Sequence, residues 1–191
     1  VRAAADLGTG TVSLPVQGAL VTFVKQLYPD AGTSDPAGFI VQAGNTGPAL
    51  FVSVDATTLP TTVGDTIDFT VTGVTRIGQL RVATGVTGFT RSSSGTPVTG
   101  LSQNVSSVDF AGAGVLDTYE AELVSLNGTL VGDMAFAGGG FQSATLATAG
   151  TSDAGTMKVR LPNALADSEG LGTGCSVQLT AAPLWRFNTQ V

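Results

Sequence analysis

The sequence predicts an all-β protein built as two small β-barrels in tandem. Short strands with alternating apolar and polar residues occur in the first half and recur in the same order about a hundred residues later. The composition agrees: Gly contributes 26 residues and charged residues only 12% of the 191, a profile typical of short strands joined by tight turns. This length allows two cores of roughly 90 to 100 residues each.

Five strands are predicted in the first half. The clearest is 63–72, where Ile67, Phe69 and Val71 alternate with polar residues, so that all three point to one face. Gly64 and Asp65 supply a turn at the beginning of this strand. The predicted strands are 16–24, 38–42, 50–54, 63–72 and 80–90.

The second half repeats the first four strands of this order. A short helix is expected between the third and fourth of them, over 162–169, with Gly170 to end it. Trp185 and Phe187 follow. They are interpreted either as an exposed platform for stacking a sugar or as a buried final strand, and the volume that a small barrel needs favours burial. The predicted strands are 122–131, 140–142, 157–161 and 171–180.

The pattern divides the chain into four parts: an N-terminal extension over 1–13, a first barrel over 14–92, a connecting segment over 93–116 and a second barrel over 117–191. The connecting segment is polar and rich in turns at its beginning. It then carries several apolar residues, which predict that it packs against one or both barrels and holds them rigidly. These residues are Val98, Leu101, Val105, Val108 and Phe110.

Charge and hydropathy limit the classes of partner. Eight basic against fourteen acidic residues give a net charge of −6, which opposes binding to a phosphate backbone and disfavours nucleic acid. No apolar run is long enough to span a bilayer. The low Lys content with abundant Thr, Ser and Gly favours a secreted or cell-surface protein. The lone Cys175 is expected to be a small buried side chain.

The residue types argue against an enzyme. The sequence has no His, which excludes a Ser-His-Asp triad, a Cys-His pair and His-ligated zinc. Asp117, Glu120 and Glu122 lie close in sequence, and paired carboxylates hydrolyse glycosides in other proteins. On a strand, however, Glu120 and Glu122 share one face, and a solvated strand edge is the favoured interpretation.

A calcium site is the metal hypothesis, and no other cofactor is expected. Asp30, Asp35 and Asp55 lie in loops containing Gly and Pro, where carboxylates and backbone carbonyls together are suitable calcium ligands. Their spacing matches no known calcium loop such as the EF-hand, which weakens this hypothesis.

The strand motifs resemble the OB-fold modules of secreted bacterial proteins, including those associated with extracellular nucleases and adhesins. The likeness is carried by Gly38-Phe39-Ile40-Val41-Gln42, by 49–54 and by Val63-Gly64-Asp65-Thr66-Ile67. The second half departs from the pattern, because Leu171-Gly172-Thr173-Gly174 replaces Val-Gly-Asp. The resemblance implies two OB-like barrels, with short helical or irregular connections, that bind, space or assemble without catalysing.

OB-folds bind oligosaccharides or oligonucleotides across the face of strands two and three. For this chain the resemblance implies a glycan-binding face. No Lys or Arg lies between Gln26 and Arg76, so the basic half of a nucleic-acid groove is missing. The residues expected on that face are Phe39, Gln42, Phe51 and Gln142.

Two functions follow as hypotheses. The first is a non-enzymatic extracellular structural protein, a self-assembling filament or surface-layer subunit. Little in the segment 1–11 is expected to order it within its own domain, so it is predicted to contact an adjacent copy and form a homo-oligomer. The alternative is a secreted OB-fold module that binds an oligosaccharide.

Overall fold

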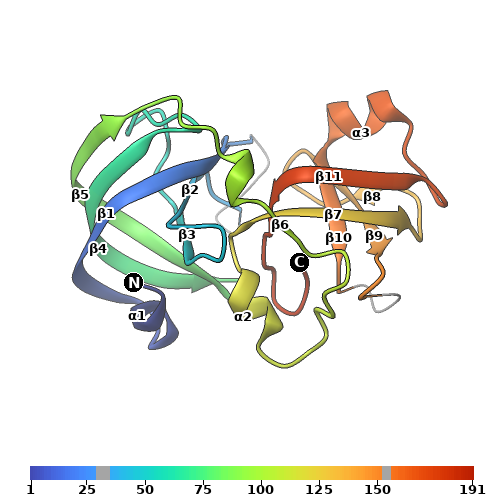
Figure 1. The fold of residues 1–191 in the computed structure, drawn as a ribbon, viewed down its shortest axis with the longest axis horizontal. Coiled ribbons are helices and arrows are strands. Elements are labelled where there is room, and N and C mark those ends of the chain that lie inside the picture. Colours follow the sequence, from blue (N-terminus) through green and yellow to red (C-terminus); the bar gives the residue numbers. More distant parts are fainter. Residues whose placement is uncertain (29–34, 152–155) are drawn as a thin grey trace.

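The computed structural model describes residues 1–28, 35–151 and 156–191. The fold is all-β, as predicted. A closed five-stranded barrel forms the first half, and a six-stranded sheet forms the second half beside it (Figure 1). Within the described residues, no helix is long and apolar enough to cross a membrane.

The barrel contains the five strands that the sequence predicts, with some ends extended. Its closed order is β1-β2-β3-β5-β4. The β3–β5 pair is parallel, with Phe51 opposite Val82, and the other pairs are antiparallel. The strands are β1 (Gly10–Lys25), β2 (Gly38–Gln42), β3 (Ala49–Val52), β4 (Thr66–Ile77) and β5 (Leu80–Ser93).

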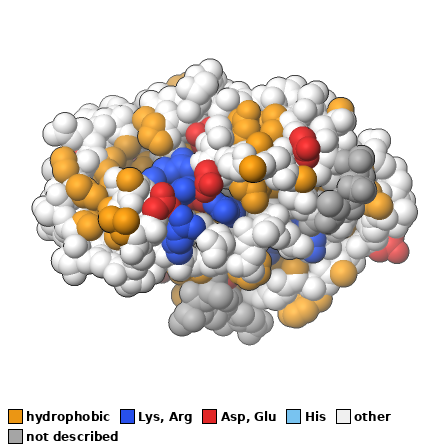
Figure 2. Space-filling model, turned by 90° about the horizontal axis from the view of Figure 1, so that it is seen from below, with side chains coloured by type: hydrophobic (Ala, Val, Ile, Leu, Met, Phe, Trp, Pro, Cys, Tyr) orange, Lys and Arg blue, Asp and Glu red, His pale blue; other side chains and the backbone are white. Residues whose placement is uncertain are grey.

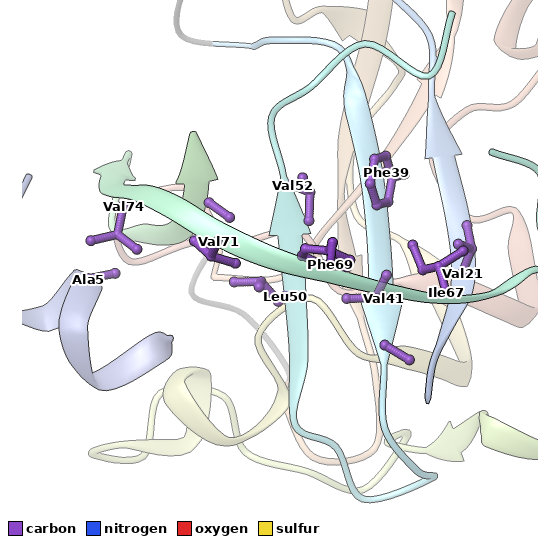
Figure 3. Packing of buried hydrophobic residues seen from close by; sticks show 12 residues of the cluster. Ala5, Val21, Phe39, Val41, Leu50, Val52, Ile67, Phe69, Val71 and Val74 are labelled. Carbon is purple, nitrogen blue, oxygen red and sulfur yellow. The ribbon is translucent and has the colours of Figure 1, made fainter. Parts of the chain in front are cut away.

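Alternation places one face of each barrel strand in the core. Ile67, Phe69 and Val71 of β4 are at most 3% exposed, as their spacing predicts. They point toward Phe39 of β2 and toward side chains from the other strands (Figure 3). The Phe39 and Phe69 rings meet edge to face, with 6.4 Å between centroids.

The second half contains the other six strands. Four of them follow the order β10-β9-β7-β11, with β6 paired to β7 and β8 paired to β9. In the described residues this path begins at β10 and ends at β11, so the sheet lacks the closure seen in the first half. The strands are β6 (Gln103–Asn104), β7 (Leu123–Leu130), β8 (Ala135–Phe136), β9 (Phe141–Ala147), β10 (Lys158–Pro162) and β11 (Ser176–Pro183).

In the described residues, three short α-helices and one 3-10 turn connect or flank the strands. The predicted helix is present as α3 (Asn163–Glu169), and Gly170 ends it in the left-handed conformation at φ 57°. The others are α1 (Arg2–Asp6), α2 (Val115–Tyr119) and the 3-10 turn η1 (Thr99–Leu101).

Three of the five apolar residues named for the segment between the halves pack in the core of the second half. Val105 and Phe110 are buried in the core of the second half, and Val108 packs against them. Tyr119 meets the Phe110 ring edge to face at 5.7 Å. The segment therefore contributes core residues and is no free linker. Cys175 is half-buried at the rim of the same core.

The N-terminal segment differs from its prediction. Residues 2–6 form α1, and Ala5 is fully buried against the core of its own barrel. Asp6 forms ion pairs with Arg76 and Arg81 of the same chain. The expectation that little orders this segment within its own domain was wrong, because Ala5 lies in the barrel core, Val1 and Ala4 pack against that core, and Asp6 pairs with two arginines.

Candidate functional site

The candidate functional site is the contact between the barrel and the second half, here called the junction. It has an apolar part, an ion network, a buried amide contact and two cations beside aromatic rings. Half of the chain's eight basic residues, namely Arg2, Arg76, Arg81 and Arg186, meet in the ion network. No other region of the described residues gathers as many charged side chains.

The apolar part covers the outer face of β2 and β3. Ile40 and Phe51 point away from the barrel core, yet both are 0% exposed. Ala121 and Trp185 of the second half cover them. The Phe51 and Trp185 rings meet edge to face at 4.7 Å between centroids. Strands β2 and β3 are therefore buried on both faces, by the barrel core inside and by the second half outside.

The ion network lies beside the apolar part, on the side of the molecule where Figure 1 labels α1 and α2. Figure 2 shows this side, with basic and acidic side chains gathered on it. Arg81 of β5 is its centre and is 9% exposed at its side chain. Its guanidinium lies 2.6 Å from Asp6, 2.8 Å from Asp117 and 3.3 Å from Glu120. Each carboxylate comes from a different segment, so a single arginine connects α1, α2 and the residue after α2 to the barrel.

Arg186 extends the network into the C-terminal segment. Its Nη1 lies 2.6 Å from Asp117 and 3.1 Å from Glu120. Glu120, which is 2% exposed, also accepts a hydrogen bond from the Arg81 backbone N–H at 3.0 Å. Arg2 of α1 donates to the Asp117 carbonyl. Buried charges with several partners of this kind are costly to separate.

The arginines favour the charged forms of the acids around them. The hydrogen bond from Arg81 is the main reason that the pKa of Asp6 lies below its usual value. Burial acts in the opposite direction at Asp117, but the hydrogen bonds and charges of Arg186 and Arg81 outweigh it and lower that pKa as well. Both acids therefore stay ionised at neutral pH.

Gln42 joins the halves through an amide contact. Its side chain is 1% exposed, and its Oε1 accepts from the Leu123 backbone N–H at 2.9 Å. Its Nε2 donates to the carbonyls of Gly44 at 2.7 Å and Leu101 at 3.3 Å. Gln42 thus satisfies backbone groups from three segments at a place that water does not reach.

Glu122 is a buried junction acid whose pKa is raised. It is 2% exposed and accepts a hydrogen bond from Gln103 at 2.6 Å. Its Oε1 lies where a Cβ on Gly47 would sit, so the glycine, at φ 76°, makes room for it. Burial raises the pKa of Glu122, and the charge of Arg2 with the Gln103 hydrogen bond offsets only part of this.

We expect this burial to make the junction more stable as the pH falls from neutral. The folded state holds the Glu122 proton more tightly than the unfolded state, whose pKa is 4.5, so stability from this group is lost as pH rises through the folded pKa. Asp6 and Asp117 have lowered pKa values, so their contribution to stability is lost on acidification, but only near and below pH 3.8.

Urea titrations between about pH 5 and 8 test the sign of the Glu122 effect. The unfolding free energy of Glu122→Gln minus that of the unsubstituted protein should grow as the pH rises. A difference that stays constant with pH contradicts this prediction.

The fourth contact places two cations against aromatic rings. Lys25 of β1 is 6% exposed at its side chain and lies 3.1 Å from Asp35. Arg160 of β10 reaches the same carboxylate at 2.8 Å and stacks 4.0 Å from the centroid of Phe141. Asp35 therefore connects the barrel to the second sheet.

The four residues expected on a glycan face do not form one. Phe39 lies in the barrel core, Phe51 lies under Trp185, and Gln42 is buried in the junction. Gln142 lies apart on β9, half-buried, where it donates to Asp167 at 2.6 Å. The expectation of an exposed face failed because alternation identifies which side of a strand faces the barrel core but not what covers the other side.

The acidic residues are also placed differently from expectation. Glu120 and Glu122 are buried rather than on a solvated edge, because Ala121 between them adopts φ 64° and β7 begins only at Leu123. Asp35 is held by two cations, and half-buried Asp55 accepts from the Thr57 backbone N–H at 2.8 Å. Asp30 lies outside the described residues. Among the described residues, no three metal-ligating side chains gather.

Trp185 and the arginines are the junction residues that the sequence patterns do not identify. Trp185 is half-buried, and it serves neither as an exposed platform nor as part of a final strand of the second half. Arg186 lies beside it. The available signal is the scarcity of basic residues, since within the described residues six of the eight form ion pairs: Lys25, Arg76, Arg81, Arg91, Arg160 and Arg186.

Comparison with known proteins returned no match to any family model, curated protein or solved structure.

Proposed function

We propose that this protein is a non-enzymatic extracellular structural subunit that self-assembles into a filament or surface layer. In this proposal it is built of two OB-like units held as one rigid body. The observation that carries the proposal is the covered outer face of β2 and β3. This is the face that an OB-fold presents to its ligands, and here the second half of the same chain occupies it.

The barrel supports the OB-like assignment. An OB-fold is a five-stranded Greek-key barrel. The order β1-β2-β3-β5-β4, with a parallel β3–β5 pair, fits this architecture. Loop residues 53–65 connect β3 to β4. At the corresponding place in the second half, α3 lies between β10 and β11.

The second half supports a tandem origin. Its path β10-β9-β7-β11 corresponds to β3-β2-β1-β4 of the barrel. The turn before the last strand matches as well: Gly64 donates to Val21 O at 2.9 Å and Gly174 donates to Leu130 O at 2.9 Å. Both glycines have positive φ, 93° and 86°. We infer that the second half is an OB-like unit, of which the described residues show four of the five strand positions.

A scaffold function agrees with how the chain uses its charged and aromatic residues. Arg81, Arg186 and Glu120 are committed to one another in the junction, and Phe51 and Trp185 pack together. These residue types are the ones that a ligand-binding face needs. The structural hypothesis is favoured over the oligosaccharide-binding alternative because the residues that would bind the sugar are used internally.

Light scattering of the purified protein over a range of concentrations tests the proposal. We expect the mass to rise with concentration well beyond that of a single chain. Salt should have little effect on this rise if strand pairing, rather than surface charge, drives the assembly. A protein that stays monomeric at the highest attainable concentration contradicts the proposal.

A further inference from the structure

Lys25 is a lysine in a kind of place where this chain otherwise uses arginine. Of the six basic residues that form ion pairs within the described residues, five are arginines and the sixth is Lys25. Its side chain is 6% exposed and that of its partner Asp35 is 12% exposed, so both members of the pair are removed from water. A buried lysine loses its charge far more readily than an arginine does. Lys25 therefore brings an amine that can become a nucleophile into the interior of the protein.

The neighbours of the Lys25 Nζ atom hold it against the Asp35 carboxyl group. Nζ lies 3.0 Å from the Asp35 carbonyl oxygen, 3.1 Å from the Pro36 carbonyl oxygen and 3.1 Å from Asp35 Oδ1. A neutral amine keeps two N–H groups and one lone pair. When both N–H groups donate to the two carbonyls, the lone pair is left facing the third neighbour, which is the carboxyl group.

The surroundings of this pair favour the loss of both charges. Burial lowers the pKa of the Lys25 ammonium. The charge and hydrogen bond of Asp35 act against this, and the nearby charge of Arg160 adds to it. The rings of Trp185 and Phe141 lie 5.9 Å and 6.0 Å from Nζ. A proton that passes from Nζ to Oδ1 turns the buried ion pair into a neutral amine beside a carboxylic acid, which removes the cost of burying two charges.

Arg160 lies on the other oxygen of the same carboxyl group. Its Nη2 is 2.8 Å from Asp35 Oδ2, and its guanidinium is stacked 4.0 Å from the centroid of Phe141. Negative charge collects on Oδ2 when an amine adds to the carboxyl carbon, and a fixed guanidinium at this distance stabilises that charge. The three side chains therefore supply a nucleophile, an electrophile and a group that stabilises the oxyanion.

We propose that Lys25 and Asp35 condense into an intramolecular amide cross-link. The bond from Nζ to Cγ forms and the bond from Cγ to Oδ1 breaks. Two protons of the ammonium leave with Oδ1 as one molecule of water, and Oδ2 becomes the amide oxygen beside Arg160. The reaction is a condensation without any oxidation or reduction.

The cross-link goes beyond the proposed function and does not depend on assembly. It fastens β1 covalently to Asp35, the residue that Arg160 of β10 contacts across the junction. The chain has a single Cys, so this amide would give it a covalent tie that a pair of its own cysteines cannot. Light scattering and mass spectrometry therefore judge the two proposals separately.

Mass spectrometry of the purified, unfolded full chain tests for the lost water. We expect the main species to be lighter than the mass of the sequence by one water molecule. Trypsin cleaves after lysine and arginine, and an amide at Nζ blocks cleavage at Lys25, so residues 3–76 should stay in one fragment. Fragmentation of that peptide should place the link between Lys25 and Asp35. A chain of full mass overturns the proposal, and so does a chain that has lost water but is still cut at Lys25.

The two lysines of the chain provide a matched pair of variants. Lys25→Arg keeps the positive charge without the amine and should have its full mass. Lys158→Arg makes the same substitution at the other lysine and should still be lighter by one water molecule. A Lys25→Arg chain that has also lost water contradicts the proposal. The mass of the unsubstituted chain decides independently of whether Lys25→Arg folds.

A further variant tests the part assigned to Arg160, which acts on the carboxyl group without forming a bond. We expect Arg160→Gln to reduce the cross-linked fraction from nearly all of the chain to a minority, as read from the two masses in one spectrum. Arg91→Gln removes an arginine from a different ion pair, with Asp65, and should remain fully linked. An Arg160→Gln chain that is fully linked would overturn this role of the guanidinium.

Discussion

Replacing Glu120 with Ala should lower the free energy of unfolding by about 3–5 kcal/mol, the usual cost of breaking a buried ion pair from one side. Glu120 is 2% exposed and accepts from Arg81 and Arg186, whose side chains are 9% and 13% exposed. Without the carboxylate, these guanidinium groups keep Asp117 as their shared acid, and the Arg81 backbone N–H loses its acceptor. Native stability is about 5–15 kcal/mol, so the loss is a large fraction of the total.

Chemical denaturation monitored by circular dichroism measures this loss. Glu169→Ala is the matched control, because Glu169 is an exposed glutamate on α3 and should change stability by no more than about 0.5 kcal/mol. If Glu120→Ala proves as stable as the control, the arginines do not depend on Glu120, and the network is not what holds the junction.

Replacing Phe51 with Ala should cost a comparable amount, about 3–5 kcal/mol, the typical value for removing a buried aromatic ring. Phe51 is 0% exposed and fills the space between the outer face of β3 and Trp185. Removing its ring leaves a cavity at the contact between the halves. We expect Trp185 to become more exposed to water, because its edge-to-face partner is gone.

Fluorescence provides a readout that is specific to the junction. The chain has a single Trp, so emission reports on Trp185 alone, and Phe51→Ala should shift it to longer wavelength under native conditions. Phe136→Ala serves as control, since Phe136 is 79% exposed and remote in sequence from both halves of the contact. A Phe51→Ala protein with unshifted emission and undiminished stability would mean that the second half does not cover β3.

Much of the fold was predictable because one-sided strands carry a strong signal. The alternation over 63–72 identifies β4 and its inward residues, and Gly170 marks the end of α3. Strand ends were less predictable: β1 begins at Gly10 and not at Val16, and its residues before Ala19 are exposed or half-buried. The helix α1 was missed because five residues give no clear helical period.

The junction was not predictable from these patterns. Ile40 and Phe51 are apolar on the outer side of their strands, and their cover comes from Ala121 and Trp185, far away in sequence. Periodicity describes one strand at a time and gives no information on such pairs. Likewise, Glu120 and Glu122 looked solvated because their arginine and amide partners, Arg81 and Gln103, lie on other elements.

Electron microscopy of the purified native protein tests the central claim most directly. Under the proposed function, the protein should form filaments or sheets with a repeat set by one two-part unit. Images showing only separate particles the size of one chain, at concentrations where light scattering is performed, would contradict the account.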